Sequence, residues 1–186
     1  KHHILKVVFS LSLSGKSVAI IAGPDYEDLE LHYPLLRFKE EGADVKVVAP
    51  TRDTYRGKHG LSIVPDLTID EALIKDFDII IIPGGWAPDR LRRDSRVVEF
   101  VRKHGQKGAI IGAICHGPQL LISAKLLSGK KATCVSGIKD DVINAGATFI
   151  DAPVVVDGNI ITSRVPDDLP SFCKAIIEEA SKLRRK

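Results

Sequence analysis

The stretch "DIIIIPGG" at residues 78–85 is the most direct sign of the fold class. Four consecutive β-branched isoleucines are typical of a parallel strand that is covered on both faces. A second apolar run, "AIIGAI" at residues 109–114, has the same character, and a helical pattern at residues 94–108 separates the two runs. A strand, a helix and another buried strand in this order predict a parallel β-α-β unit.

The same alternation continues along the rest of the chain. We predict further strands at residues 17–22, 44–50 and 158–163, short strands near Thr133 and Val154, a hairpin at 55–66, and helices at 26–42, 68–77, 139–147 and 168–185. This pattern predicts one doubly wound α/β domain with a mainly parallel sheet, in which ligands lie beyond the carboxyl ends of the strands. We assign that domain to residues 17–186 and interpret residues 1–16 as an N-terminal extension or tail.

Composition excludes several classes of protein. The net charge of +3 is small, and no basic block is interleaved with aromatic residues, so we expect no nucleic-acid partner. No run reaches the roughly 18 apolar residues of a membrane span, so we expect no membrane partner. The three cysteines, Cys115, Cys134 and Cys173, fit neither a disulfide framework nor a zinc site. Free thiols indicate the reducing cytoplasm.

The stretch "GAIIGAICHGPQ" at residues 108–119 places Cys115 where a buried strand passes into a helix. The Gly-Pro pair that follows marks a tight turn, and proline suits a first helical turn. Unpaired backbone N–H groups and the helix dipole favour a thiolate at such a position. The layout is that of a nucleophile elbow with sulfur in place of oxygen. We therefore predict Cys115 as a nucleophile, and Cys134 and Cys173 as packing residues.

His116 and a pair of glycines complete the groups near the thiol. The His116 imidazole could act as a base or proton carrier if the turn is sharp, and its backbone N–H can donate to an oxyanion. Gly84 and Gly85 follow another strand of the same sheet, where glycine lets the backbone approach a substrate oxygen. We predict Gly85 as the second oxyanion donor. A plain turn is the alternative interpretation of the two glycines.

The segment "DYEDLEL" at residues 25–31 supplies carboxylates. Glu27 and Glu30 are three residues apart and so share one helix face. Either could exchange a proton with the thiol, and a solvated helix start is an equally good interpretation of both. A metal cluster of Glu27, Asp28, Glu30 and His32 is a weaker alternative, and we expect neither a metal nor a cofactor.

Five motifs together resemble the PfpI-type intracellular cysteine proteases of the ThiJ/PfpI superfamily. In chain order between Ser17 and Lys182 they include "PDYEDLEL", "IIIIPGGWAPDRLR", "AICHGPQLLISAKLLSGKKAT", "GIKDDVINAGA" and "DGNIITSRVPDDLP". The resemblance implies a flavodoxin-like, class I glutamine amidotransferase-like three-layer sandwich with Cys115 as nucleophile. It also implies a homo-oligomer, a dimer or a hexamer, with the site near a subunit interface.

The resemblance further assigns roles to acidic residues. It places Glu30 against the sulfur, with Glu27 as a neighbour in the pocket. It makes Asp89, contributed by an adjacent subunit, the acid of a triad with Cys115 and His116.

Three other pocket positions follow from the same resemblance. Trp86 stands where arginine or histidine is common in the family, and Val135 stands where a tyrosine can line the pocket. These departures remove a cation and a hydroxyl that would contact a peptide or a phosphate-like group. Arg164 could hold an anionic group, although we favour a structural pairing with Asp167 or Asp168.

We therefore expect a peptidase-like hydrolase in which the Cys115 thiolate attacks a carbonyl while His116 and Asp89 handle protons. The first alternative is a glyoxalase or deglycase that acts on methylglyoxal or glycated adducts, with Glu30 as proton shuttle. The expected substrate is accordingly a peptide or a small aldehyde. The second alternative is a redox-sensing stress protein or holdase that uses oxidation of Cys115.

Overall fold

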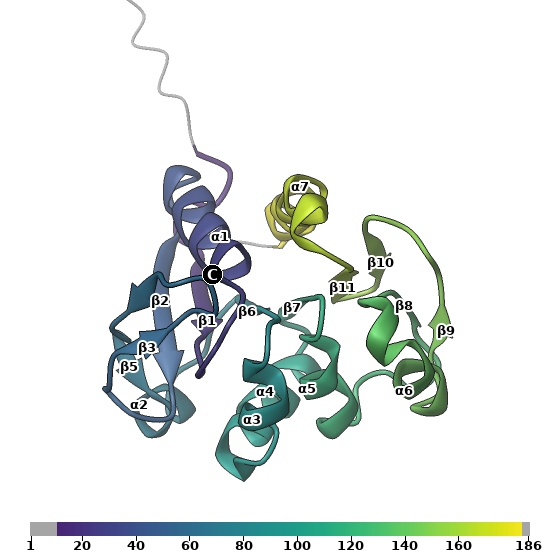
Figure 1. Cartoon of the computed structure of the whole chain (residues 1–186). Coiled ribbons are helices and arrows are strands. Elements are labelled where there is room, and N and C mark those ends of the chain that lie inside the picture. The colour runs from purple at the N-terminus through teal and green to yellow at the C-terminus, as the bar shows by residue number, and fades with distance from the viewer. Residues whose placement is uncertain (1–10, 184–186) are drawn as a thin grey trace, which may run out of the picture.

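A seven-stranded sheet forms the centre of the protein in a computed structural model that describes residues 11–183 (Figure 1). Its strand order is β10-β11-β7-β6-β1-β2-β5, and every neighbouring pair is parallel except β10 with β11. The strands are β1 (Ser17–Ile21), β2 (Asp44–Ala49), β5 (Leu67–Thr68), β6 (Ile79–Ile82), β7 (Ile110–Ile114), β10 (Val155–Asp157) and β11 (Ile160–Ser163). The predicted mainly parallel sheet is confirmed.

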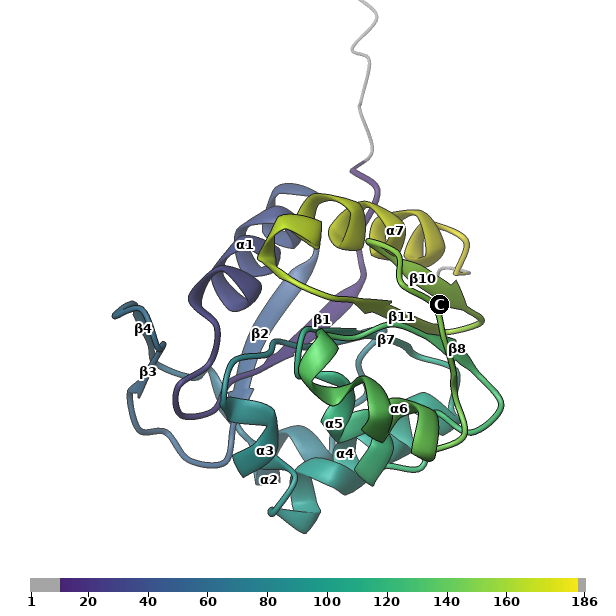
Figure 2. The same ribbon diagram turned by 45° about the vertical axis from the view of Figure 1, so that its right-hand side comes forward.

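Helices cover both faces of this sheet and give three layers. Figure 2 shows α1 (Asp28–Glu40) and α7 (Leu169–Ser181) on one face. The helices on the other side are α2 (Ile69–Leu73), α3 (Ala87–Leu91), α4 (Ser95–Gln106), α5 (Pro118–Ser123) and α6 (Lys139–Asn144). All four isoleucines of β6 are fully buried, as expected for a strand covered on both faces. The predicted three-layer sandwich is confirmed.

Two small strand pairs lie outside the main sheet. The predicted hairpin consists of β3 (Tyr55–Arg56) and β4 (Ser62–Ile63), which pair antiparallel. A second pair, β8 (Lys131–Ala132) with β9 (Thr148–Phe149), is parallel. The sequence pattern missed β5, β9 and α3, because elements of two to five residues carry too little periodicity.

The segment before β1 packs against the domain as far as the structure describes it. Leu13 is fully buried, and its N–H donates to the Glu41 carbonyl at 3.0 Å. The Lys16 ammonium donates to the Leu183 carbonyl at 3.1 Å. The first ten residues of the expected extension lie outside the described residues. Within residues 11–183, the structure contains no helix with the length and apolar character needed to cross a membrane.

The topology brings four chain segments to one edge of the sheet. Strands β11, β7, β6 and β1 are neighbours and run parallel, so their carboxyl ends lie side by side. These ends lead into Arg164, Cys115, the Gly84–Gly85 pair and the segment 25–30 respectively. The direction of strand succession reverses between β6 and β1, which is where open α/β sheets bind ligands.

Candidate active site

Cys115 occupies a constrained turn directly after β7. Its φ is 64°, in the left-handed region that residues other than glycine seldom adopt, and such strain gathers at functional sites. Its N–H donates to the Ser163 carbonyl at 3.0 Å, and its carbonyl accepts from the Val135 N–H at 3.1 Å. A Cβ at Gly117 would run into the Ile82 carbonyl, so glycine lets the chain turn tightly into α5.

The Cys115 thiol is nearly buried, with 8% of the residue exposed. Burial, and then the negative charge of Glu30, raises its pKa to about 12. The backbone N–H groups of Gly85 and His116 act in the opposite direction, because they face the sulfur and favour the thiolate. The structure thus brings both predicted oxyanion donors to the predicted nucleophile.

Glu30 faces the same point from α1. It is fully buried, and its Oε1 accepts the Gly84 N–H at 2.8 Å. Its Oε2 has no hydrogen-bond partner among residues 11–183. A Cβ at Gly84 would come to 2.6 Å from the Glu30 Oε1 and 2.7 Å from the Cys115 Cβ. The absence of a side chain at Gly84 therefore lets the carboxyl and Cys115 approach each other.

The Glu30 carboxyl keeps its proton at neutral pH. Burial raises its pKa to about 8, against the Gly84 hydrogen bond, which lowers it. From the residues alone, Glu27 and Glu30 were equally good candidates for exchanging a proton with the thiol. In the structure it is Glu30 that lies beside Cys115. A protonated Glu30 no longer opposes ionisation of Cys115, so one proton shared between the two groups is the chemically useful state.

The His116 ring does reach the sulfur, because the turn is sharp. Its Nδ1 lies 3.4 Å from the Cys115 Sγ, and the ring centroid lies 5.8 Å from that of Trp86. Burial, followed by the charge of Lys58, lowers the pKa of His116, so the imidazole is neutral at pH 7. Trp86 is 58% exposed and covers one side of this imidazole.

Asp89 makes a different contact from the one that a triad requires. Its carboxylate lies in α3 and pairs with Arg93, one helical turn later, at 2.7 Å. Among residues 11–183 no hydrogen bond joins Asp89 to His116. The expectation that an adjacent subunit supplies Asp89 to this site stays a prediction.

Glu27 is buried and belongs to an ion pair that the sequence did not indicate. Its Oε2 lies 2.9 Å from the Lys58 Nζ and 3.4 Å from the His59 Nε2. Its backbone N–H donates to the Gly84 carbonyl at 3.1 Å. Lys58 and His59 come from the turn of the β3–β4 hairpin, and only the tertiary fold brings that turn to α1.

The remaining members of the considered metal cluster have structural partners. The Asp28 carboxylate accepts the N–H groups of His59 at 2.9 Å and Leu61 at 2.8 Å. Burial pushes the pKa of Asp28 upward, but these backbone donors outweigh it and lower the pKa. The His32 Nε2 lies 2.8 Å from the Tyr26 hydroxyl. In the described part of the chain, no three His, Cys, Asp or Glu side chains gather as metal ligands.

Arg164 is held by carboxylates on two sides. Its Nε lies 3.0 Å from Asp168 and its Nη1 lies 2.9 Å from Asp151, which supports the structural pairing. Arg164 and Val135 line a cavity of about 440 Å³ together with Cys134. The Val135 N–H bonds to the Cys115 carbonyl, so one wall of this cavity is tied to the Cys115 backbone, while Cys115 itself does not line the cavity.

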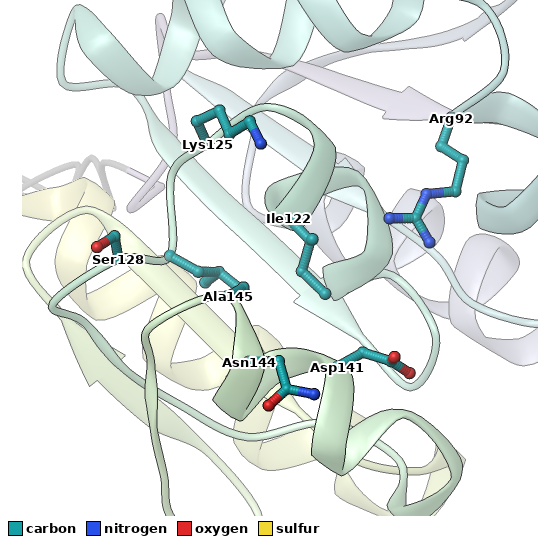
Figure 3. Close-up of a pocket in the computed structure, with 8 residues that line it drawn as sticks. Arg92, Ile122, Lys125, Ser128, Asp141, Asn144 and Ala145 are labelled. Atoms are coloured by element: carbon teal, nitrogen blue, oxygen red, sulfur yellow. The ribbon is translucent and has the colours of Figure 1, made fainter.

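A separate cavity of about 360 Å³ lies between α5 and α6, and its lining includes Arg92, Lys125 and Asp141 (Figure 3). None of the site residues lines this cavity, so it plays no part in the chemistry around Cys115.

The fold and the site together define an α/β protein with a cysteine elbow at its centre. The chain matches the DJ-1/PfpI family over residues 16–179 and belongs to that family. A deglycase of Pyrococcus horikoshii is 46% identical over 161 residues, which is 87% of this chain and 97% of that protein. Protein/nucleic acid deglycase 2 of Escherichia coli is 44% identical over 161 residues, 85% of this chain and 94% of that protein.

The solved structures give the same result. The DJ-1/ThiJ/PfpI-like and ferritin-like two-domain protein of Anabaena variabilis superposes with a TM-score of 0.86 and 42% identity over 92% of this chain. This chain spans about half (51%) of that two-domain chain. The family predicted from the motifs is confirmed.

Proposed function

We propose that this protein is a cofactor-independent deglycase that releases amines from their adducts with methylglyoxal and similar 2-oxoaldehydes. The observation that carries the proposal is the buried Glu30 carboxyl, protonated at neutral pH and facing the Cys115 thiol. Such a pair moves protons within a small, dry site. The names of the relatives in Pyrococcus horikoshii and Escherichia coli support deglycase chemistry over the peptidase that the motifs first indicated.

The first chemical step exchanges the amine for the sulfur. The step starts from the minor ionised form of Glu30 that a pKa of about 8 leaves at neutral pH. In that form the Glu30 carboxylate accepts the Cys115 proton, and the sulfur bonds to the carbinol carbon of the adduct R–NH–CH(OH)–CO–CH₃. The C–N bond breaks, and the amine leaves with the proton that Glu30 returns. The product is a thiohemiacetal on Cys115, and Glu30 is again ionised.

The second step is an internal redox exchange between two carbons. Glu30 removes the hydrogen of the sulfur-bearing carbon as a proton and returns it to the neighbouring carbon, while the hydroxyl proton on the first carbon passes to the oxygen of the second. The first carbon is thereby oxidised to a thioester and the second is reduced to a carbinol, with no external oxidant. The N–H groups of Gly85 and His116 support the negative oxygen that forms on the way.

Hydrolysis completes the cycle. Water adds to the thioester carbon, the C–S bond breaks, and the sulfur regains a proton. Lactate and one proton are released. His116, neutral and 3.4 Å from the sulfur, is placed to carry a proton in this step.

The test measures lactate release from an adduct of methylglyoxal with an amine, beside cleavage of a fluorogenic peptide. We expect wild type and Cys173→Ala to release lactate, Glu30→Gln to lose at least about 100-fold in rate, and Cys115→Ser to lose at least about a thousandfold. Cys173 is a matched control because it is a second buried thiol outside the site. Peptide cleavage without lactate release overturns the proposal and restores the Cys115–His116–Asp89 triad.

A further inference from the structure

We propose that Lys58 is the carboxylate-binding residue of this site and that it binds the small 2-hydroxy acid that the reaction forms. This inference rests on the proposed function, because deglycation of a 2-oxoaldehyde adduct ends in such an acid. The role of Lys58 follows from where the β3–β4 hairpin lies.

The backbone of Lys58 is tied to the segment that carries the oxyanion donor. Its N–H donates to the Tyr26 carbonyl at 3.0 Å. Tyr26 in turn forms a β-bridge with Gly85, whose N–H faces the Cys115 sulfur. Tyr26 therefore links the backbone of Lys58 to Gly85, which fixes the position of Lys58 relative to the Gly85 donor.

A dedicated buried carboxylate holds the hairpin turn in place. Asp28 is 3% exposed, and its two carboxylate oxygens accept hydrogen bonds from the backbone N–H groups of His59 and Leu61. Gly57 has no side chain where a Cβ would collide with the Asp28 carboxylate. Figure 2 shows this hairpin beside the start of α1. Because the buried Asp28 carboxylate holds the hairpin turn in one conformation, we infer that the turn positions a functional side chain, and Lys58 lies in that turn.

The Lys58 ammonium is held by an ion pair and still has donor hydrogens available for a ligand. Its Nζ lies 2.9 Å from the Glu27 Oε2, while 32% of the Lys58 side chain is exposed. An ammonium has three donor hydrogens, and Glu27 accepts one, which leaves donors for a ligand. Since Glu27 is almost fully buried, the ion pair also holds the long lysine side chain in one place.

The charge of Lys58 reaches the reacting groups. Burial is the largest cause of the shifted pKa of Cys115, and Lys58 favours its thiolate. Burial likewise dominates the pKa of Glu30, and Lys58 favours its carboxylate. A carboxylate that forms beside Cys115 is therefore attracted by this cation, while the neutral adduct that enters gains less from it.

The contrasting interpretation is that Lys58 only neutralises Glu27. Three variants separate the two roles. Lys58→Arg keeps the charge, Lys58→Met removes it, and the double variant Glu27→Gln with Lys58→Met removes both partners, so that no buried charge is left alone. Lys75→Met is the matched control, because Lys75 is exposed and has no ion-pair partner in the described residues.

The experiment is a calorimetric titration of the full chain with D- and L-lactate, and with lactamide as the uncharged analogue. We expect wild type, Lys58→Arg and Lys75→Met to bind one lactate isomer at millimolar concentration. Lys58→Met and the double variant should bind it at least about tenfold more weakly, since a charge-assisted hydrogen bond is lost. Lactamide should bind equally weakly to all five proteins.

Two results overturn the inference: equal lactate affinity in wild type and the double variant, or no lactate binding by wild type at these concentrations. Failure of the proposed function looks different. In that case wild type releases no lactate from any adduct, while the titration still shows a carboxylate site that depends on Lys58. A parallel rate assay adds a kinetic criterion, because Lys58→Met should relieve product inhibition by lactate with little change in KM for the neutral adduct.

Discussion

Cys115 and Cys173 are two buried thiols of one chain, and burial raises the pKa of each to about 12. Their surroundings differ. Cys173 lies within α7 among apolar side chains, in regular helical backbone. Cys115 lies in a left-handed turn with two backbone donors and a carboxyl against it. Burial thus raises the pKa of both thiols alike, and the backbone donors that favour a thiolate are present only at Cys115.

The largest difference should appear when each thiol is replaced by a hydroxyl. Cys115→Ser removes the nucleophile, and we expect the lactate-forming rate to fall by at least about a thousandfold. Cys173→Ser should keep the rate per folded molecule but lower the free energy of unfolding by about 1–3 kcal/mol, since it buries a hydroxyl among apolar groups. Rate assays and urea unfolding of both variants check this, and a fully active Cys115→Ser would break the comparison.

The approach of Glu30 to Cys115 across Gly84 can be blocked without touching either residue. In Gly84→Ala the new methyl collides with the Glu30 Oε1 and the Cys115 Cβ. We expect a rate loss of about 100-fold and a destabilisation of about 1–3 kcal/mol. Gly137→Ala is the control, because nothing lies within 4 Å of its Cβ position. Equal behaviour of the two variants would contradict the proposed contact.

Glu30 should also make the free energy of unfolding depend on pH. Its pKa is about 8 in the folded protein against an ordinary value of 4.5, so the folded state binds the proton more tightly. This contribution is fully present below about pH 4.5 and is lost as pH rises through 8, an effect of roughly 5 kcal/mol. Urea unfolding at about pH 5 and about pH 9 should show the loss in wild type and not in Glu30→Gln. The same pH dependence in both proteins would refute the raised pKa.

The smallest effect is expected at Asp89. Its carboxylate is 52% exposed and pairs only with Arg93 in the described residues. We expect Asp89→Asn to change stability by less than about 0.5 kcal/mol and the lactate rate by less than about twofold.

The same variant tests the expected subunit contribution. If an adjacent subunit supplies Asp89 to a protease-like triad, peptide cleavage is lost while lactate release continues. Sedimentation of wild type shows whether a dimer or hexamer is present for such a contribution. Survival of both activities unchanged means that Asp89 is not catalytic.

Local sequence patterns were enough to predict the class of fold and to place Cys115 in a strand-to-helix turn. The isoleucine run at 79–82, the glycine pair after it and the turn at Cys115 are local signals, since burial on two faces and a tight strand-to-helix turn each restrict which residues fit. The sequence pattern did not predict α3, because a helix of five residues shows little periodicity.

Which of Glu27 and Glu30 lies beside Cys115 depends on tertiary contacts, because both residues suit the same helix face. Glu30 accepts the Gly84 N–H, whereas Glu27 pairs with Lys58. Tertiary contacts also show that Asp28 binds the hairpin backbone and that Asp168, not Asp167, pairs with Arg164. They likewise place Lys58 against Glu27. The physical reason is that hydrogen-bond partners and pKa values depend on groups from distant parts of the chain. Strand pairing and packing bring those groups together, and no local pattern records it.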